Sequence, residues 1–484
     1  MDARPTDLLR QDALIDGAWV AAASGARFAV HNPATGEKLG DVPDMGVAET
    51  RLAIEAAAKA LPAWRAKPAK DRARVLRDWC DLILEEQERL AEIVTAEQGK
   101  PLAEARGEIS YGASFVDWFG EEGRRIYGDV LPLTSGDRRQ LVFKQPVGVV
   151  AAITPWNFPS AMFARKAGAA LGAGCTMILK PAEQTPFSAL ALAALAERAG
   201  LPAGVLNVVT ARDPAPIGRE LTRNPLVRKL TFTGSTQVGK ILLAQAADNV
   251  LKCSMELGGN APLIVFEDAD IDLAVRGALA TKYRNCGQTC VSANRILAHE
   301  SVAAEFARRL AACATDLKVG DGREEGVVIG PLIEEAAVEK CERHVADAIS
   351  RGAKLLTGGA RHALGGTFFQ PTVLAGVKED ALIFNEETFG PVAPVVAFKD
   401  EPDAIRLANA TPYGLAAYFY SRDLARIFRV AEALDFGMVG VNETLISSEV
   451  APFGGIKHSG MGREGSRYGI EDYLEVKYVC LGGM

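Results

Sequence analysis

The 484-residue sequence has few cysteines and no long hydrophobic run. Its 8 cysteines are too sparse for a disulfide-stabilised scaffold. The N-terminal stretch is rich in aspartate and lacks the apolar segment that a secretory signal requires. The apolar runs, such as 147–155, are interrupted well before the ~18–20 residues that span a bilayer. We therefore expect a cytoplasmic protein that does not enter a membrane.

The sequence also has fewer basic than acidic residues. The chain has 54 Lys and Arg against 61 Asp and Glu, a formal net charge of −7, and no basic block. This excludes a typical binder of nucleic acid or of anionic membranes. The 5 histidines are scattered singly, with no Cys/His cluster at ligand spacing, so we expect no metal site. Apolar residues make up 48% of the sequence, as in globular proteins, and the length suggests about three domains.

The chain alternates strand-like and helix-like segments from residue 147 onward. Expected strands lie at 147–154, 176–179, 205–209, 229–233 and 251–256, with helices at 159–173, 185–199, 213–223 and 235–248. A second alternating region has strands at 263–266, 295–298, 392–398, 416–420 and 438–441. Two helical stretches, 68–98 and 101–126, come first, and an Arg-rich strand, 138–144, follows them. Repeated β-α-β units predict parallel, doubly wound sheets with ligands beyond the carboxyl ends of the strands.

Two phosphate-binding motifs are present in the wrong context. Gly460–Gly465 matches G-x-G-x-x-G, but no strand-like run precedes it and too little chain follows for a βαβ unit. Gly234–Lys240 resembles a P-loop, but Ile241 stands where a Ser or Thr must ligate magnesium. Neither segment therefore predicts a nucleotide-binding site of its usual kind.

Polar residues at strand ends point to a cofactor site. Gly234 lies where a strand meets a helix, and the free N–H groups of that helix suit a pyrophosphate, although an ordinary turn has the same sequence. Lys180 and Glu183 follow another strand and could bind ribose hydroxyls, or form a solvated ion pair. In the loop 385–391, a carboxylate can accept from a ribose and the ring of Phe389 can pack against a planar cofactor.

Three residues have the chemistry of a covalent active site. Asn157, between two prolines, can stabilise an oxyanion, or simply form an Asx turn. Glu256, beside two glycines, can act as a general base if burial raises its pKa, or be an ordinary turn carboxylate. Cys290 lies in a polar loop, as an accessible thiolate nucleophile requires. Cys286 and Cys290 could instead be a metal pair, but their spacing is poor for zinc.

Taken together, these motifs resemble the aldehyde dehydrogenase superfamily. The segments are PWNFP (155–159), LKPAEQTP (179–186), FTGST (232–236), ELGGN (256–260), GQTC (287–290) and EETFGP (386–391). The resemblance covers nearly the whole chain, from 32–36 to 465–469. Within the superfamily, segments 184–190, 283–290 and 446–453 are most similar to the succinate-semialdehyde dehydrogenase group.

The resemblance implies an α/β fold of two doubly wound parallel-sheet (Rossmann-like) domains with a small β oligomerisation arm. An NAD-binding domain would comprise 1–126 and 146–258, and a catalytic domain 259–442. The arm would comprise 127–145 and 466–484. Because paired strand edges remove unpaired backbone groups, we expect a homodimer or homotetramer.

The resemblance also implies the mechanism. Cys290 attacks an aldehyde, Asn157 and the Cys290 N–H hold the oxyanion, and Glu256 activates water to release the acid from a thioester. Cofactor-binding positions would be Thr154, Pro155, Trp156, Lys180, Glu183, Gly234, Ser235, Gly239, Glu386 and Phe389. Because Glu183 would repel a 2′-phosphate, we expect NAD, with NADP possible since Lys180 offsets this charge.

For the substrate, the resemblance implies that Arg165, Arg284 and Ser447 bind a distal carboxylate. Arginine forks suit carboxylates, although both arginines could instead form structural salt bridges. The expected reaction is oxidation of succinate semialdehyde to succinate. The alternative is a glutarate-semialdehyde or broad-specificity aldehyde dehydrogenase, because one methylene changes discrimination by only ~1–3 kcal/mol.

Two further expectations concern catalysis and redox chemistry. A non-catalytic relative of the fold would lack reactive residues, whereas Cys290, Glu256 and Asn157 are all present. Several members of the group carry a second cysteine two residues after the nucleophile, where this chain has Ser292. Cys286 could pair with Cys290 instead, provided that their Cα atoms lie within ~7 Å.

Overall fold

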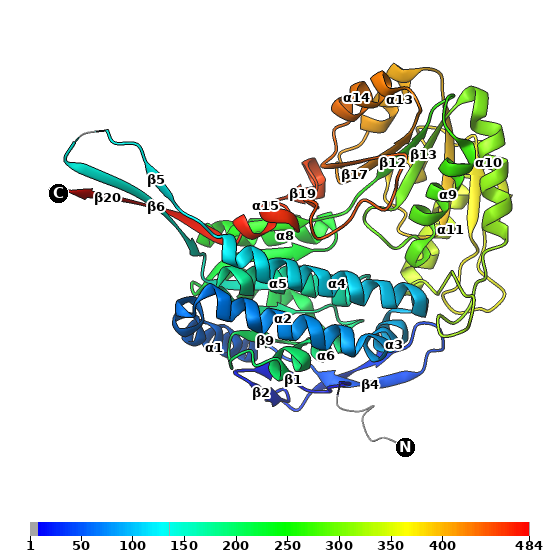
Figure 1. Cartoon of the computed structure of the whole chain (residues 1–484). Coiled ribbons are helices and arrows are strands. Elements are labelled where there is room, and N and C mark those ends of the chain that lie inside the picture. The colour runs from blue at the N-terminus through cyan, green and yellow to red at the C-terminus, as the bar shows by residue number, and fades with distance from the viewer. Residues whose placement is uncertain (1–7, 135, 484) are drawn as a thin grey trace.

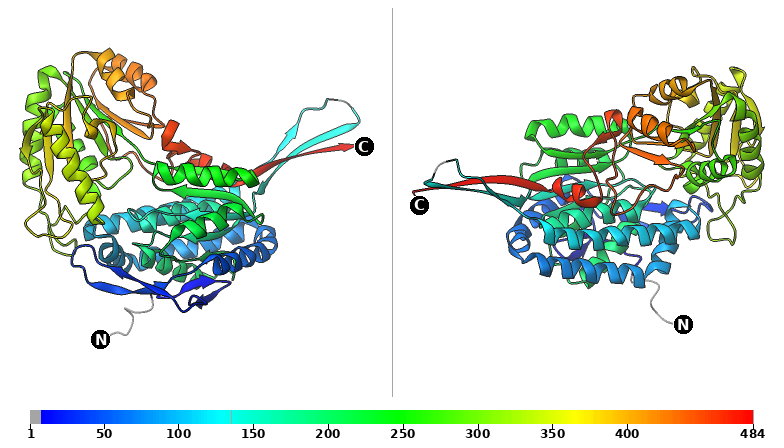
Figure 2. Two further views of the ribbon diagram at one scale, coloured as in Figure 1. Left: turned by 180° about the vertical axis from the view of Figure 1, so that it is seen from behind. Right: turned by 45° about the horizontal axis from the view of Figure 1, so that its top comes forward.

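The computed structural model describes residues 8–134 and 136–483. Two α/β units lie side by side, and a narrow arm of strands projects from the first unit (Figure 1). Two further views show the arm extending away from both units (Figure 2). The predicted fold, with two mainly parallel sheets and a small β arm, is confirmed.

The first sheet has the strand order β19-β11-β10-β7-β8-β9-β1-β2. Its five central strands run parallel: β7 (Val149–Ile153), β8 (Thr176–Lys180), β9 (Leu206–Val208), β10 (Val227–Thr233) and β11 (Lys252–Glu256). Antiparallel strands close its edges: β1 (Ala13–Ile15), β2 (Ala18–Val20) and β19 (Gly460–Met461). The crossover helices are α5 (Pro159–Ala173), α6 (Pro186–Arg198), α7 (Pro214–Arg223) and α8 (Thr236–Ala246), followed by the 3₁₀ turn η2 (Ala247–Asn249). The predicted strands and helices of this region are thus confirmed, and α5 has the predicted bounds.

Helices from the first quarter of the chain pack against this sheet and its crossover helices. They are α1 (Val47–Ala66), α2 (Ala69–Glu85), α3 (Gln87–Gln98) and α4 (Leu102–Glu122), and the turn η1 (Gly123–Arg125) follows. The backbone at Glu86 (φ −99°, ψ 15°) divides the predicted helical stretch 68–98 into two helices. Glycine allows α4 and α5 to approach closely, since a Cβ on Gly172 would lie 2.5 Å from the Phe119 carbonyl oxygen. A separate hairpin pairs β3 (Arg27–His31) with β4 (Lys38–Pro43).

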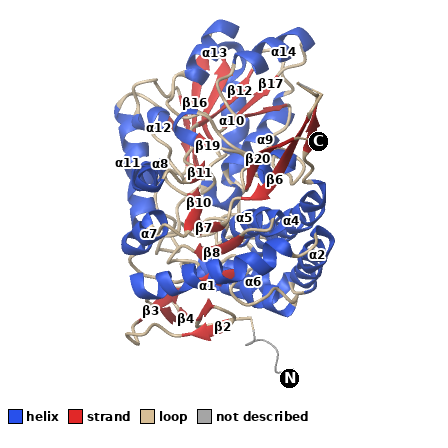
Figure 3. Ribbon diagram, turned by 90° about the vertical axis from the view of Figure 1, so that its left-hand side faces the viewer, coloured by secondary structure: helices blue, strands red, loops and turns tan. Residues whose placement is uncertain are grey.

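The second sheet has the order β14-β15-β16-β13-β12-β17-β18 and is parallel except for the β14–β15 pair. Its strands are β12 (Ala261–Val265), β13 (Ala293–His299), β14 (Lys354–Thr357), β15 (Thr372–Ala375), β16 (Val392–Phe398), β17 (Ala416–Tyr420) and β18 (Met438–Val441). Its helices are α9 (Ile271–Lys282), α10 (Glu300–Thr315), α11 (Glu335–Ser350), α12 (Leu382–Asn385), α13 (Glu401–Asn409) and α14 (Leu424–Ala433). Helices flank the strands of both units (Figure 3).

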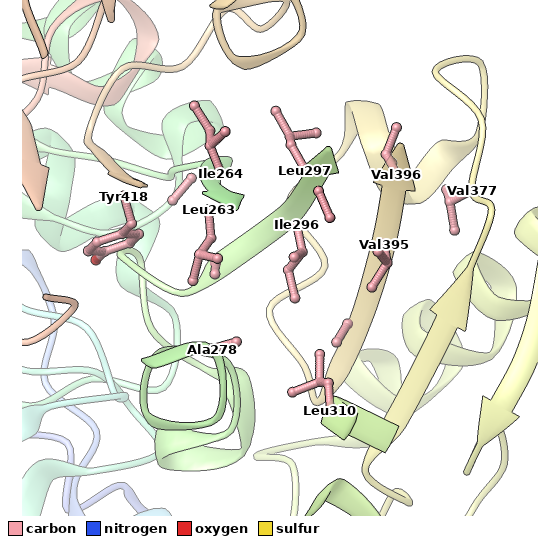
Figure 4. Close-up of a cluster of buried hydrophobic side chains, with 14 of the residues drawn as sticks. Leu263, Ile264, Ala278, Ile296, Leu297, Leu310, Val377, Val395, Val396 and Tyr418 are labelled. Carbon is pink, nitrogen blue, oxygen red and sulfur yellow. The ribbon is translucent and has the colours of Figure 1, made fainter. Parts of the chain in front are cut away.

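Aliphatic side chains on both faces of the second sheet form its core (Figure 4). Leu263 and Ile264 of β12 and their neighbours Ile296 and Leu297 of β13 have no exposed surface. Successive side chains of a strand point to opposite faces, so continuous apolar runs mark a sheet that is covered on both faces. This is the burial pattern of a doubly wound parallel sheet.

The arm is a three-stranded antiparallel sheet. It consists of β5 (Asp129–Leu131), β6 (Arg138–Pro146) and β20 (Leu474–Gly482), so the predicted strand 138–144 is confirmed within β6. The turn η4 (Lys457–Ser459) and strand β19 precede α15 (Ser466–Glu471), which packs against α4 and α5. The chain therefore crosses between the units twice, at 257–260 and at 442–459. In the part of the chain that the structure describes, no helix is long and apolar enough to span a membrane.

Candidate active site

Two cavities meet at Cys290. The first, of about 400 Å³, includes Trp156, Ser235 and Phe389 in its lining. The second, of about 380 Å³, includes Arg165 and Arg284. Cys290, Phe158 and Met162 line both cavities. A thiol is thus accessible from two separate spaces, as a nucleophile acting between a cofactor and a substrate must be.

Cys290 lies between the turn η3 (Arg284–Gly287) and β13 and is half-buried. Asn285 and Cys286 in this turn adopt left-handed backbone conformations, with φ of 50° and 56°. Burial, together with the charges of Glu387 and Glu256, raises the pKa of the Cys290 thiol to about 12. At neutral pH the Cys290 side chain is therefore a thiol, and the predicted attack on carbon requires the loss of its proton.

Asn157 is held by hydrogen bonds to distant parts of the chain rather than by an Asx turn. Its carbonyl oxygen accepts from Lys100 Nζ (2.7 Å) and from Asn285 Nδ2 (3.0 Å). Its own Nδ2 donates to the Gln288 carbonyl (3.0 Å), and the residue lines the first cavity with Cys290. An amide nitrogen has two hydrogens, so one remains for an oxygen atom bound near Cys290.

Glu256 ends β11 as a buried carboxyl group, and neither of its oxygens has a hydrogen-bond partner among the described residues. Burial raises the pKa of Glu256 well above its ordinary value, and the charge of Glu464 raises it further. Arg165 and Lys166 oppose this shift. A base with a raised pKa can take a proton near neutral pH, as the predicted role requires.

Arg165 forms an ion pair with Glu464, a residue that the sequence motifs did not identify. Its Nη2 atom lies 2.7 Å from Glu464 Oε2, and Lys166 Nζ binds the other carboxylate oxygen. The two cations lower the pKa of Glu464 although burial would raise it. The Arg165 guanidinium lies 4.2 Å from the ring centroid of Phe453 and also lines the second cavity. Arg165 therefore forms the structural ion pair left open as an alternative, and faces a ligand space as well.

Arg284 and Ser447 also line the second cavity. No ion pair of Arg284 occurs within 8–134 or 136–483, and its guanidinium lies 5.3 Å from the Phe158 ring centroid. Tyr111 of α4 joins them, and its hydroxyl has no hydrogen-bond partner among these same residues. Sequence reasoning missed Tyr111, which lies in a helix without any motif. Besides these guanidinium and hydroxyl groups, the lining includes the hydroxyl groups of Thr289 and Thr444 and the carboxyl groups of Glu104 and Glu108.

The predicted cofactor positions divide into two sets. Five of them line the first cavity: Pro155, Trp156, Gly234, Ser235 and Phe389. Lys180 ends β8 and Gly239 lies in α8, whereas Thr154 and Glu183 lie in the loops that follow β7 and β8, and none of these four lines either cavity. The Phe389 and Trp156 rings meet edge to face, with centroids 5.6 Å apart. Lys180 Nζ lies 3.0 Å from Glu183 Oε2, and Ser235 caps α8 by accepting from Val238 N (3.2 Å).

Of the two adjacent glutamates, Glu387 lines the first cavity and Glu386 does not; Glu334 also lines it. The Glu386 side chain is 46% exposed and lies 3.1 Å from His344 Nε2. Glu387 lines the cavity, and its Oε1 accepts from Gly259 N (2.9 Å). Burial raises the pKa of Glu387 to about 7. The structure therefore shifts the expected position by one residue, which two adjacent glutamates in a loop could not reveal.

Cys286 is 1% exposed and lines neither cavity, and all 8 cysteines are free thiols. The proposed pairing of Cys286 with Cys290 stays a prediction. No group of three His, Cys, Asp or Glu side chains is placed to hold a metal ion among the residues that the structure covers.

Comparisons with known proteins agree with this geometry. Residues 19–479 match the model of the "Aldehyde dehydrogenase family". The chain is 63% identical over 484 residues to a glutarate-semialdehyde dehydrogenase of Pseudomonas aeruginosa, covering 100% of both chains. It is 61% identical over 482 residues to an NADP(+) succinate-semialdehyde dehydrogenase of Escherichia coli, also covering 100% of both. A crystal structure described as an E. coli NADP dependent enzyme superposes with a TM-score of 0.98 at 62% identity, over 99% of each chain.

These similarities extend over both sheets, the arm and both cavities, and they confirm the resemblance read from the motifs. The chain belongs to the aldehyde dehydrogenase family.

Proposed function

We propose that this enzyme oxidises succinate semialdehyde to succinate, with NAD or NADP as hydride acceptor. The observation that carries the proposal is the second cavity, in which Arg165, Arg284 and Ser447 lie in the same lining as Cys290. Guanidinium groups in a confined space bind carboxylates strongly, so an aldehyde with a terminal carboxylate fits this lining. The relatives named for succinate and glutarate semialdehydes support it.

In the proposed mechanism, the Cys290 thiol gives its proton to water as Sγ forms a bond to the aldehyde carbon, and the π electrons of the C=O bond pass to its oxygen. The oxyanion accepts hydrogen bonds from Asn157 Nδ2 and from the Cys290 backbone N–H, which stabilise its charge. Nicotinamide, when bound, supplies the acceptor for the hydride that leaves this carbon. Glu256 then takes a proton from the water that attacks the Cys290 thioester, and the acid is released.

The lining of the first cavity fits a nicotinamide cofactor. Trp156 and Phe389 offer faces and edges for a planar ring, and the Glu387 carboxylate can accept from ribose hydroxyls. Ser235 begins α8, whose first-turn amides suit a pyrophosphate. We propose Glu387, instead of Glu386, as the ribose contact at this end.

The other end of the cofactor would reach Lys180 and Glu183. The Glu183 carboxylate favours NAD, because it would repel a 2′-phosphate. Lys180 lies 3.0 Å away and offsets this charge, which supports additional use of NADP, the cofactor named for one relative. Dual use with a preference for NAD is therefore the proposed behaviour.

Glutarate semialdehyde is the nearest alternative substrate, since the relative named for it is 63% identical. It carries the same two functional groups as succinate semialdehyde and one more methylene. The ~1–3 kcal/mol that a methylene contributes permits turnover of both. Preference between them is therefore a matter of degree at the same site.

The test is a steady-state panel of aldehydes that differ in length and terminal charge, measured with NAD and with NADP. Arg284→Ala should raise KM for succinate semialdehyde about tenfold or more, from the loss of a charged hydrogen bond, and leave an uncharged aldehyde within about twofold. Arg276→Ala, an exposed arginine of α9, is the control. Equal effects of Arg284→Ala on both substrates would remove the carboxylate-binding role.

We also propose that the arm mediates assembly into a homodimer or homotetramer of cytoplasmic enzyme. β20 is an edge strand, and it exposes Val476, Tyr478 and Leu481. Unpaired edges and exposed apolar side chains are stabilised by contact with another subunit. We further propose that residues 1–126 and 146–258 form the cofactor-binding domain and that residues 259–442 form the catalytic domain. Residues 127–145 and 466–484 would form the arm that mediates assembly.

A further inference from the structure

Lys100 is a buried cation behind the loop that carries Asn157. It lies in the link between α3 and α4, and its side chain has no exposed surface. Its Nζ lies 2.6 Å from Glu108 Oε2, 2.7 Å from the Asn157 carbonyl oxygen and 3.7 Å from the centroid of the Phe158 ring. An ammonium group is costly to bury, so this full set of partners indicates a specific role.

Glu108 extends the contact to the helix that follows the loop. Its Oε1 accepts from the backbone N–H of Ser160 (2.9 Å) and of Ala161 (3.1 Å). These amides belong to the first turn of α5 and have no partner inside the helix. The Lys100–Glu108 pair therefore holds residues 157–161 through one carbonyl and two amide groups.

The side chains held in this way face the reacting thiol. Asn157 and Phe158 both line the first cavity with Cys290, whereas Lys100 lines neither cavity. An oxyanion donor acts only when it lies within hydrogen-bond reach of the developing charge, so small displacements are costly. Fixing the backbone of Asn157 is thus a direct way to fix its amide.

We propose that Lys100, held by Glu108, is a positioning residue for the Asn157 amide. It contributes to aldehyde oxidation without touching substrate or cofactor. The proposal rests on the oxyanion role of Asn157 in the proposed function.

The test compares Lys100→Met, Asn157→Ala and the double variant, using an aldehyde that the unaltered enzyme oxidises. Loss of one oxyanion donor lowers kcat by about 10²–10³-fold, so Lys100→Met should lower kcat/KM by about ten- to hundredfold. The double variant should be no slower than Asn157→Ala, since a residue that acts only through Asn157 has nothing more to lose. Additive losses would overturn the proposal.

A second readout separates positioning from general damage. Alkylation of Cys290 by iodoacetamide forms no oxyanion, so its rate in Lys100→Met should stay within about twofold of the unaltered enzyme. An equal loss in alkylation and in aldehyde oxidation would overturn the proposal. Arg72→Met is the matched control, because Arg72 is also buried and also donates to backbone carbonyls, those of Lys67 and Gly172.

Glu108→Gln keeps the test decisive if Lys100→Met does not fold. It retains the shape of the side chain but removes the charge that anchors Lys100. Because Glu108 also lines the second cavity, the expected effect is read at saturating aldehyde: kcat, and with it kcat/KM, should fall severalfold while alkylation is unchanged. Unchanged kcat/KM in Glu108→Gln would then count against the pair. If Asn157→Ala itself keeps full activity, the oxyanion assignment fails instead, and the two failures are distinguishable.

Discussion

The Arg165 guanidinium and the Glu464 carboxylate lie 2.7 Å apart, beside the second cavity and close enough to Glu256 that both charges shift its pKa. The charges of the pair therefore couple Arg165, which is expected to bind substrate, to Glu256, which is expected to act as the base. A substitution of Glu464 or Arg165 is therefore expected to change the pKa of Glu256.

Glu464→Gln should move the acidic limb of the kcat–pH profile to lower pH. Burial and then the Glu464 charge raise the pKa of Glu256, so removing that charge lowers it. In the proposed mechanism Glu256 must be deprotonated to activate water, so activity should then appear at lower pH. Glu471→Gln, an exposed carboxylate bound to Lys144, is the control. A limb that stays in place or moves to higher pH would contradict this coupling.

Glu387→Gln and Glu386→Gln should differ in their effect on cofactor binding. Glu387 lines the first cavity and Glu386 does not, so only the former should raise KM for NAD, by about tenfold for a lost charged hydrogen bond. Steady-state kinetics at saturating aldehyde measure this. A larger effect from Glu386→Gln would restore the position first expected from the sequence.

Glu183→Gln should shift cofactor preference toward NADP. Removing the carboxylate leaves Lys180 without its partner at 3.0 Å and removes the repulsion of a 2′-phosphate. The ratio of kcat/KM for NADP to that for NAD should rise about tenfold, which corresponds to ~1.4 kcal/mol. Glu197→Gln is the control: Glu197 accepts a hydrogen bond from Trp19, and its substitution should leave the ratio unchanged. An unchanged ratio in Glu183→Gln would remove the argument from charge.

Alkylation should distinguish Cys290 from Cys286. Cys290 is half-buried and lines both cavities, whereas Cys286 is 1% exposed, so iodoacetamide should label Cys290 first. Because burial and two carboxylates raise the pKa of Cys290 to about 12, the rate should still rise with pH above 9. Peptide mapping measures both effects. A Cys286–Cys290 bridge after peroxide, seen in the intact mass, would show that the loop opens.

Leu297→Ala should destabilise the second unit. Leu297 has no exposed surface in the centre of the second sheet (Figure 4), so its truncation should lower the free energy of unfolding by about 2–5 kcal/mol. Leu52→Ala, at a side chain that is 57% exposed, should change it by less than ~0.5 kcal/mol. Denaturant unfolding followed by fluorescence compares them, and similar losses would argue against this core.

Much of the fold follows from local patterns. The strands β16, β17 and β18 have the predicted bounds because continuous apolar runs end at polar or glycine residues. The short strands β1 to β4 and helix α1 have no counterpart among the expected elements. Strands β1 and β2 have three residues each, too few to show a period of two, and Pro62 lies inside α1, where proline normally indicates a break.

The candidate site was predictable where one motif contains the chemistry. Cys290, Asn157 and Glu256 each lie in a distinctive segment, and the structure brings them into one region. The Lys166–Glu464 contact joins residues 298 positions apart, which no local pattern can reveal. Which of two adjacent glutamates faces a cavity likewise depends on backbone angles, including the φ of 57° at Phe389.

The two crossings of the chain between the units, at 257–260 and at 442–459, have a mechanical consequence. A body attached at one point can swivel in any direction, but a body attached at two points turns mainly about the line between them. Hydrogen bonds also join the units beside Cys290, from Asn157 Nδ2 to the Gln288 carbonyl (3.0 Å) and from the Asn285 N–H to Glu104 Oε2 (2.8 Å), so a rotation about that line would have to break them. Glu256 immediately precedes one attachment and Ser447 lies within the other, so the proposed base and the proposed substrate contact lie near that line, where such a rotation displaces atoms least.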